Sequence, residues 1–155
     1  MNWQEVCAHP GLQNLPFKIE LNEWGQVVMS PTKIYHSILQ ARIARLLPDL
    51  GEVITECAIK TAKGTKVADV AWASDECAAI IQDEVAASIA PEICIEILST
   101  GNTKDEIKEK RAPYFAAGAQ EVWTCNKKGV VRFYNHAGEM RQSHLVPNFP
   151  KEIKL

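Results

Sequence analysis

The sequence predicts an α/β (α+β) fold in which a central mixed β-sheet is flanked by helices. Segments with the composition and alternation of strands come first, a helical segment interrupts them, strands return, a second helix follows, and strands close the chain. In addition, the 155 residues are 46% hydrophobic and 23% charged, which is typical of a globular domain that buries a core. No repeat or linker divides the chain, so we expect one domain over residues 1–155.

The N-terminal part is expected to contain a short helix, a hairpin and a longer helix. The short helix covers residues 2–8. The stretches FKIEL (17–21) and GQVVMS (25–30) flank the turn-forming residues Asn-Glu-Trp and so predict a β-hairpin. Apolar residues then recur at helical spacing until Pro48, which predicts a helix.

The remainder of the chain is rich in strands. An acidic, Ala-rich connection covers residues 75–90. The other expected elements are strands over 51–62, 65–74 and 91–99, an amphipathic helix over 105–117, a hairpin over 120–135 and short polar strands within 138–155.

Charge and cysteine content limit the partners and the cellular compartment that we expect for the protein. The formal net charge of −2 provides no global attraction to polyanions, so a nucleic-acid site would have to be a local patch. Five scattered cysteines without a C-x-x-C pair indicate a reducing, cytoplasmic compartment. The N-terminus lacks the pattern of a signal peptide and no stretch has the length of a membrane span, so we expect no membrane partner.

Two carboxylates stand in stretches that otherwise read as buried strands. Asp69 lies in KVADVAW and Glu96 lies in ICIEILS. Alternation places Asp69 on the same face as Ala71 and opposite to Ala68. Because Asp is a poor strand former and a buried carboxylate is costly, such exceptions tend to mark functional sites. The alternative, an acid at a strand end that faces solvent, remains open for each.

The helix over 105–117, packed back over the sheet, is expected to bring one lysine near these acids. Lys110 is expected at the edge of the core-facing stripe that contains Tyr114, whereas Lys104 and Lys108 fall toward solvent. Two acids and one lysine at a strand end are the residues that metal-assisted phosphodiester hydrolysis uses. In this reaction the acids hold Mg²⁺, or Mn²⁺ as a substitute.

Several stretches together resemble a known family. The order of acid-bearing strand, second acid-bearing strand and helix resembles the PD-(D/E)xK nuclease superfamily. The stretches KIELNEWGQVVMSP, KVADVAW, ICIEILS and NTKDEIKEKRAPYFAAGAQEVW, together with His36, resemble more closely the Uma family, a bacterial group of restriction endonuclease-like proteins of unknown function. The resemblance covers residues 19–124, about two-thirds of the chain.

The resemblance implies a restriction-endonuclease-like fold and a Mg²⁺-dependent endonuclease that acts on DNA. Asp69 and Glu96 match the family's two acids, and Lys110 matches a catalytic lysine that the family often carries on the following helix. Glu20 matches a recurrent acid that binds metal or supports the site, and His36 matches a recurrent helix histidine. The implied metal ligands are therefore Asp69, Glu96 and Glu20. Many nucleases of this fold act as dimers, so a homodimer is a further expectation.

The chain also departs from the family pattern. Ala68 replaces a proline before the first acid, Leu98 stands where related nucleases have a strand lysine, and Thr100 replaces a proline. The change at Leu98 matters most, because activity then depends on whether Lys110 reaches the site.

Non-catalytic and purely structural interpretations of the same residues stay open. The fold can carry a catalytically inactive nucleic-acid-binding or regulatory module, or residues 69, 96 and 110 can form a satisfied polar cluster. His36 can be a hydrogen-bonded core histidine, and Glu20 can face solvent on an edge hairpin.

Overall fold

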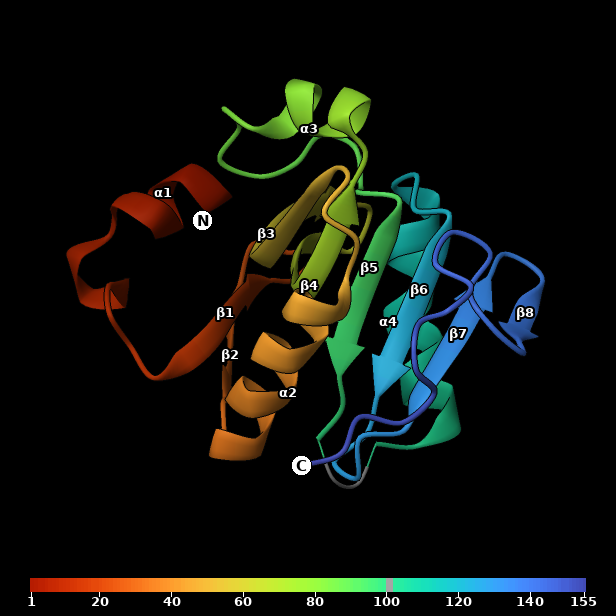
Figure 1. Cartoon of the computed structure of the whole chain (residues 1–155). Coiled ribbons are helices and arrows are strands. Elements are labelled where there is room, and N and C mark those ends of the chain that lie inside the picture. The colour runs from red at the N-terminus through yellow and green to blue at the C-terminus, as the bar shows by residue number, and fades with distance from the viewer. Residues whose placement is uncertain (100–101) are drawn as a thin grey trace.

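The computed structural model describes residues 1–99 and 102–155, so Thr100 lies outside the described residues. A six-stranded mixed sheet with the order β3-β4-β5-β6-β7-β8 forms its centre, as Figure 1 shows. The strands are β1 (Phe17–Leu21), β2 (Val27–Pro31), β3 (Glu52–Thr61), β4 (Gly64–Ala73), β5 (Ile93–Ile97), β6 (Glu121–Cys125), β7 (Val131–Asn135) and β8 (Gly138–Met140). The helices are α1 (Trp3–Ala8), the 3-10 turn η1 (Pro10–Leu12), α2 (Ile34–Leu46), α3 (Asp75–Ile81) and α4 (Lys104–Ala116).

The sheet combines antiparallel and parallel pairs. Strands β3, β4 and β5 pair antiparallel, β5 and β6 pair parallel, and β6, β7 and β8 pair antiparallel. Helix α4 lies between β5 and β6 in the chain, as a parallel pair requires a crossover. Helix α2 covers one face of the sheet and α4 the other (Figure 1). The predicted mixed sheet flanked by helices is therefore confirmed.

Each face of the sheet has its own hydrophobic core. On the α2 side, Leu39 and Ile43 pack with the three isoleucines of β5 and with Trp123. On the α4 side, Tyr114 packs with Cys94 and with the alanines of β4. Strand β5 is buried along its whole length, so Glu96 has no solvent-facing side of the strand to occupy.

Strand alternation is interrupted where β3 and β4 meet at Asp69. Glu56 has a φ of 53°, and the ladder between β3 and β4 is regular on both sides of this residue but does not include it. As a result, Ala68 and Ala71, three residues apart in β4, pack in the same core. The expected strict alternation through Asp69 is therefore wrong, because a left-handed residue turns the strand pair at this point.

Gln40 of α2 supports this irregular point. Its side-chain Nε2 donates to Glu56 Oε1 at 2.7 Å and to the backbone oxygen of Asp69 at 2.8 Å. A buried carbonyl that lacks a ladder partner needs such a donor. The irregularity is thus satisfied and holds Asp69 in a fixed place.

Two other expectations about the chain are corrected. The connection over 75–90 begins with α3, which Ser74 caps by accepting a hydrogen bond from the Cys77 amide at 3.2 Å. In the tail, β8 forms, but the described residues 141–155 supply Phe149 and Ile153 to the core in place of further polar strands.

Within residues 1–99 and 102–155, no helix combines the length and the apolar character needed to cross a membrane.

The β1–β2 hairpin is a separate two-stranded sheet that packs against β4. Gly64 makes this approach possible: it has a φ of 94°, and a Cβ there would lie 2.2 Å from the Leu21 carbonyl oxygen. Glu23 of the hairpin turn also pairs with Lys63 at 3.2 Å. The hairpin is therefore seated by contact between backbones, which leaves no room for a side chain.

We expect Gly64→Ala to destabilise the protein more than a glycine substitution that adds backbone strain alone. Gly138→Ala is the matched control, because Gly138 has a φ of 129° and nothing within 4 Å of its Cβ position. The strain at Gly138 should cost about 1–3 kcal/mol, and Gly64→Ala should exceed that cost by at least about 1 kcal/mol. Urea unfolding measures both; equal losses would show that the hairpin contact tolerates a methyl group.

Candidate active site

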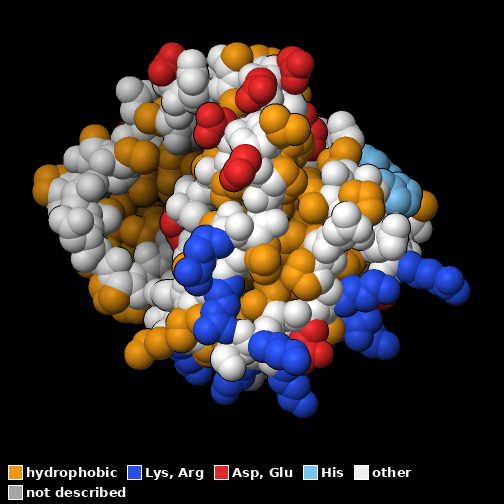
Figure 2. Space-filling model, in the orientation of Figure 1, with side chains coloured by type: hydrophobic (Ala, Val, Ile, Leu, Met, Phe, Trp, Pro, Cys, Tyr) orange, Lys and Arg blue, Asp and Glu red, His pale blue; other side chains and the backbone are white. Residues whose placement is uncertain are grey.

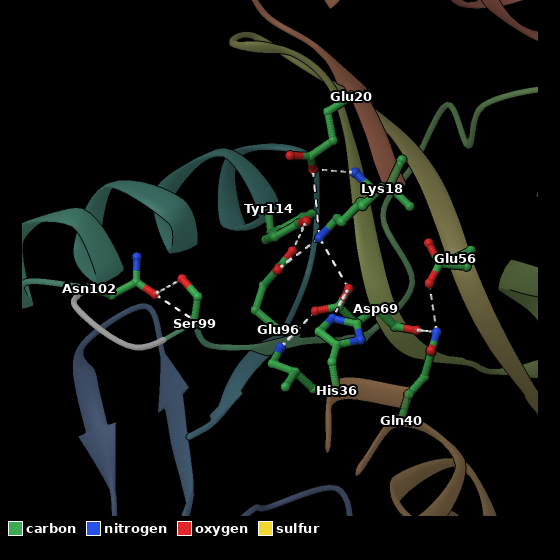
Figure 3. Close-up of polar contacts among 12 residues, drawn as sticks. Lys18, Glu20, His36, Gln40, Glu56, Asp69, Glu96, Ser99, Asn102 and Tyr114 are labelled. Carbon is green, nitrogen blue, oxygen red and sulfur yellow. Dashed lines mark hydrogen bonds and ion pairs between the residues drawn. The ribbon is translucent and has the colours of Figure 1, made fainter. Parts of the chain in front are cut away.

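Three carboxylates converge on one lysine ammonium beside the central sheet. We call Glu20, Asp69 and Glu96 the carboxylate cluster. Lys18 Nζ lies 3.1 Å from Glu96 Oε2, 3.2 Å from Asp69 Oδ1 and 4.0 Å from Glu20 Oε2. Figure 3 shows the Lys18 side chain pointing into this group, with His36 and Tyr114 on either side.

Neighbouring strands position these side chains. The antiparallel register of β4 and β5 pairs Val70 with Ile95, and one further step along the same register brings Asp69 to Glu96. Lys18 and Glu20 are two residues apart in β1, so both point from the hairpin toward the sheet. The cluster therefore depends on the hairpin being seated against β4.

Asp69 is fully buried and has one oxygen without a hydrogen bond. Its Oδ2 accepts from the Ile97 amide at 2.7 Å. Its Oδ1 lies 3.1 Å from His36 Nε2 and 3.2 Å from Lys18 Nζ, but neither contact has the angles of a hydrogen bond, and Oδ1 has no such partner among the described residues. This oxygen is held by charge alone, as is suitable for a cation ligand.

The charges of Asp69 and His36 stabilise each other. Burial acts to raise the pKa of Asp69, but the contacts with His36 and Lys18 outweigh it and lower the pKa below its usual range. The same contact with Asp69 raises the pKa of His36, against the effect of burial. Asp69 is therefore ionised at neutral pH, and His36 holds a proton more readily than a free histidine.

Glu96 forms a second buried ion pair with Lys18. Burial raises the pKa of Glu96 to about 7, although Lys18 and the hydrogen bond that Glu96 Oε1 accepts from Tyr114 act to lower it. Burial acts to lower the pKa of Lys18, but the charges of Glu96, Asp69 and Glu20 outweigh it and raise the pKa above its ordinary value. Lys18 is therefore charged at neutral pH, and Glu96 is poised to lose or gain a proton.

A cleft of about 780 Å³ opens onto the cluster. Its walls come from the hairpin, from the turn between β3 and β4, and from α4, and they include Glu20, Glu96, Tyr114 and Lys110. Asp69 does not line the cleft. A ligand in the cleft would thus meet Glu20 and Glu96 before it meets Asp69.

The structure brings four of the five sequence-predicted site residues together. Glu20, Asp69 and Glu96 lie around the Lys18 ammonium, and His36 contacts Asp69. Lys110 is exposed on α4 and shares the cleft wall with Glu96, but it forms no ion pair with the cluster among the described residues. The positions agree with a common site, and the individual roles stay predictions.

Glu20 is also tied to the backbone. Its Oε2 accepts a hydrogen bond from the Val67 amide of β4 at 2.7 Å, and its side chain is 19% exposed. The interpretation of Glu20 as a solvent-facing acid on an edge hairpin is therefore wrong, because the hairpin folds onto β4 and partly covers this side chain.

Sequence reasoning missed Lys18, Tyr114 as a hydrogen-bond donor, and Gln40. A signal for Lys18 was present in FKIEL, where a lysine two residues before Glu20 must share its face of the strand. The roles of Tyr114 and Gln40 depend on how the helices pack against the sheet, which the spacing of residues along the chain does not predict.

The donor set suits a hard divalent cation. Carboxylate oxygens are the ligands that Mg²⁺ prefers, and Asp69 Oδ1 is a buried oxygen without a hydrogen bond that already faces a positive charge. Within residues 1–99 and 102–155, however, no group of three or more His, Cys, Asp and Glu side chains is arranged to hold a metal ion. The ammonium of Lys18 lies between the two buried acids. The two carboxylates are therefore arranged to hold a cation, and the lysine ammonium occupies that position.

A solved structure shares this fold. The chain is similar to a protein described as "a putative nuclease belonging to DUF820 from Anabaena variabilis", with a TM-score of 0.66 and 18% sequence identity, over 87% of this chain and 79% of the other. At this identity the likeness concerns the fold. No curated protein matches the chain.

A family model agrees with the structural likeness and covers nearly the whole chain. The model is that of Uma2, described as "Putative restriction endonuclease", and it matches residues 3–155. This confirms the resemblance found in the sequence. The chain belongs to the Uma2 family of restriction endonuclease-like proteins.

Proposed function

We propose that this protein is a metal-dependent endonuclease that hydrolyses phosphodiester bonds of DNA. The observation that carries the proposal is the convergence of two buried carboxylates on one cation position: Asp69 Oδ1 and Glu96 Oε2 lie 3.2 and 3.1 Å from the same ammonium. The nuclease family and the nuclease fold support it. Two acids that converge in this way beside a cleft are the arrangement that metal-assisted hydrolysis requires.

The carboxylate cluster is the proposed metal site. Asp69 and Glu96 would hold Mg²⁺, with Glu20 as a third ligand or as a support through its bond to the β4 backbone. The bound ion supplies a water of lowered pKa and a positive charge against the phosphate. Tyr114 donates to Glu96 Oε1, so it orients the carboxylate and leaves Oε2 for the cation.

His36 and Lys110 complete the proposed site from opposite helices. His36 holds Asp69 in place from α2 through its contact at 3.1 Å. Lys110 of α4, on the cleft wall beside Glu96, would orient water or stabilise the charge that develops on the phosphate. A lysine on the helix would thus take the role of the strand lysine that Leu98, directly after β5, replaces.

DNA is the proposed substrate because basic side chains are grouped despite the net charge of −2. Figure 2 shows Lys and Arg side chains gathered over α2 and along the lower edge of this face, while acidic side chains gather over α3. The cleft combines Lys63, Lys66 and Lys110 with five glutamates, whereas Lys33, Arg42 and Arg45 make the groove on α2 a local basic patch. Such local patches bind phosphates without a basic protein overall. Cleavage of both strands would need two sites, which a homodimer would supply.

One observation favours a second candidate function, a binding or regulatory module without turnover. Lys18 occupies the position between the two buried acids, and Leu98, directly after β5, stands at the place of the strand lysine. DNA binding that needs no metal and leads to no cleavage would favour this second function.

We expect Asp69→Asn to lower Mg²⁺-dependent cleavage of supercoiled plasmid by on the order of a hundredfold or more, because it removes the charge of a metal ligand while keeping its shape. Asp49→Asn, at an exposed acid outside the cluster, is the matched control and should cleave like the wild type. Cleavage that survives Asp69→Asn would mean a different site or a contaminating nuclease.

We expect Lys110→Ala to lower plasmid cleavage by about tenfold or more, since it removes a positive charge beside the phosphate. Lys108→Ala is the control on the same helix, because Lys108 is exposed and does not line the cleft. Equal activity of the two variants would remove Lys110 from the proposed mechanism.

A pH-dependent stability follows from Glu96. The unfolded chain releases this proton near pH 4.5 and the folded chain near pH 7, so the free energy of unfolding falls as pH rises between these values. From pH 5 to pH 7 the metal-free wild type should lose on the order of 2 kcal/mol, and Glu96→Gln should lose much less. Urea unfolding checks this, with Glu52→Gln, at an exposed acid, as the control. Parallel losses in all three proteins would place the titration elsewhere.

A further inference from the structure

The ammonium of Lys18 contacts the carboxylate oxygens that the proposed metal ion needs. It lies 3.2 Å from Asp69 Oδ1 and 3.1 Å from Glu96 Oε2, and Figure 3 shows it between the two side chains. Asp69 Oδ1 has no hydrogen bond among the described residues, so its charge is compensated by Lys18 together with His36. The site therefore already contains one cation, and the protein itself provides it.

We propose that Lys18 competes with the divalent metal for the carboxylate cluster: it holds Asp69 and Glu96 together in the metal-free protein, and its ammonium must leave them for metal to bind. The inference rests on the proposed function, which supplies the metal. It gives Lys18 a positioning role, distinct from the role proposed for Lys110 beside the phosphate.

Charge makes the two states exclusive. Lys18 Nζ lies within 4.0 Å of three carboxylates, a setting that favours the charged ammonium. An ammonium and a divalent ion that share the same two oxygens would lie within a few ångströms of each other, where the repulsion between like charges is strong. Binding of one therefore requires release of the other.

The fold provides a place for the released ammonium. The Lys18 side chain is 10% exposed, and Glu20, which is 4.0 Å from Nζ, lines the cleft. The flexible four-carbon stem of lysine can rotate toward this opening while β1 stays in place. Glu20 can thus keep a contact with Lys18 after Asp69 and Glu96 have turned to the metal.

Direct titration with Mn²⁺ tests the competition. Electron paramagnetic resonance counts free Mn²⁺ during titration of the wild type, Lys18→Met and Lys108→Met, the last being an exposed lysine on α4. We expect Lys18→Met to bind Mn²⁺ at least about tenfold more tightly than the wild type. Lys108→Met should bind like the wild type. Damage to the fold would weaken metal binding, so tighter binding separates competition from a merely structural role.

Thermal unfolding provides a second readout. Without metal, Lys18→Met should melt at a lower temperature than the wild type, because three acids lose their counter-charge. Added Mn²⁺ should raise its melting temperature by more than it raises that of the wild type. Equal or weaker Mn²⁺ affinity in a folded Lys18→Met would overturn the inference.

If Lys18→Met does not fold, Lys18→Arg tests the competition between lysine and metal. Lys18→Arg keeps the charge and adds a fork that suits carboxylates, so it should bind Mn²⁺ more weakly than the wild type. Tighter binding by Lys18→Arg would overturn the inference. If Lys18→Met binds Mn²⁺ more tightly but the wild type cleaves no DNA, the inference stands and the nuclease function falls. If no variant binds Mn²⁺, both fall.

Discussion

One buried ammonium between two buried carboxylates is the interaction on which the rest of the site depends. Taking such charges out of water costs several kcal/mol for each ion, and the cost is offset only when the geometry is good and the remaining polar atoms are satisfied. Here Tyr114 satisfies Glu96, and the Ile97 amide satisfies one oxygen of Asp69. Lys18 balances the charge and so couples the β1–β2 hairpin to β4 and β5.

This dependence explains several features that look unrelated along the chain. Gly64 allows the hairpin backbone to approach β4, and Glu20 fastens the hairpin there through the Val67 amide. The left-handed Glu56 interrupts the ladder beside Asp69, and Gln40 satisfies the carbonyl that this leaves. The left-handed backbones of Glu56 and Gly64 depart from regular sheet structure, and together these features place charged groups inside a core, as is common at functional sites.

The charge of the cluster depends on pH. Asp69 and Lys18 stay charged at neutral pH, whereas Glu96, with a pKa of about 7, does not hold a full charge there. The net charge of the site thus changes with small changes of pH around neutrality. In the proposed function such a balance favours metal binding, because a site that is fully satisfied without metal would have little affinity for it.

The fold class, the main elements and the two acids Asp69 and Glu96 could be predicted from the residues alone, because burial patterns and misplaced charges are local signals. Family resemblance added His36, Glu20 and Lys110, and the family is confirmed. The position of Lys18 between Asp69 and Glu96, and that of Lys110 on the cleft wall, emerged from the folded structure. The reason is physical: the seat of a hairpin on a distant strand depends on packing between backbones, which the spacing of residues along the chain does not encode.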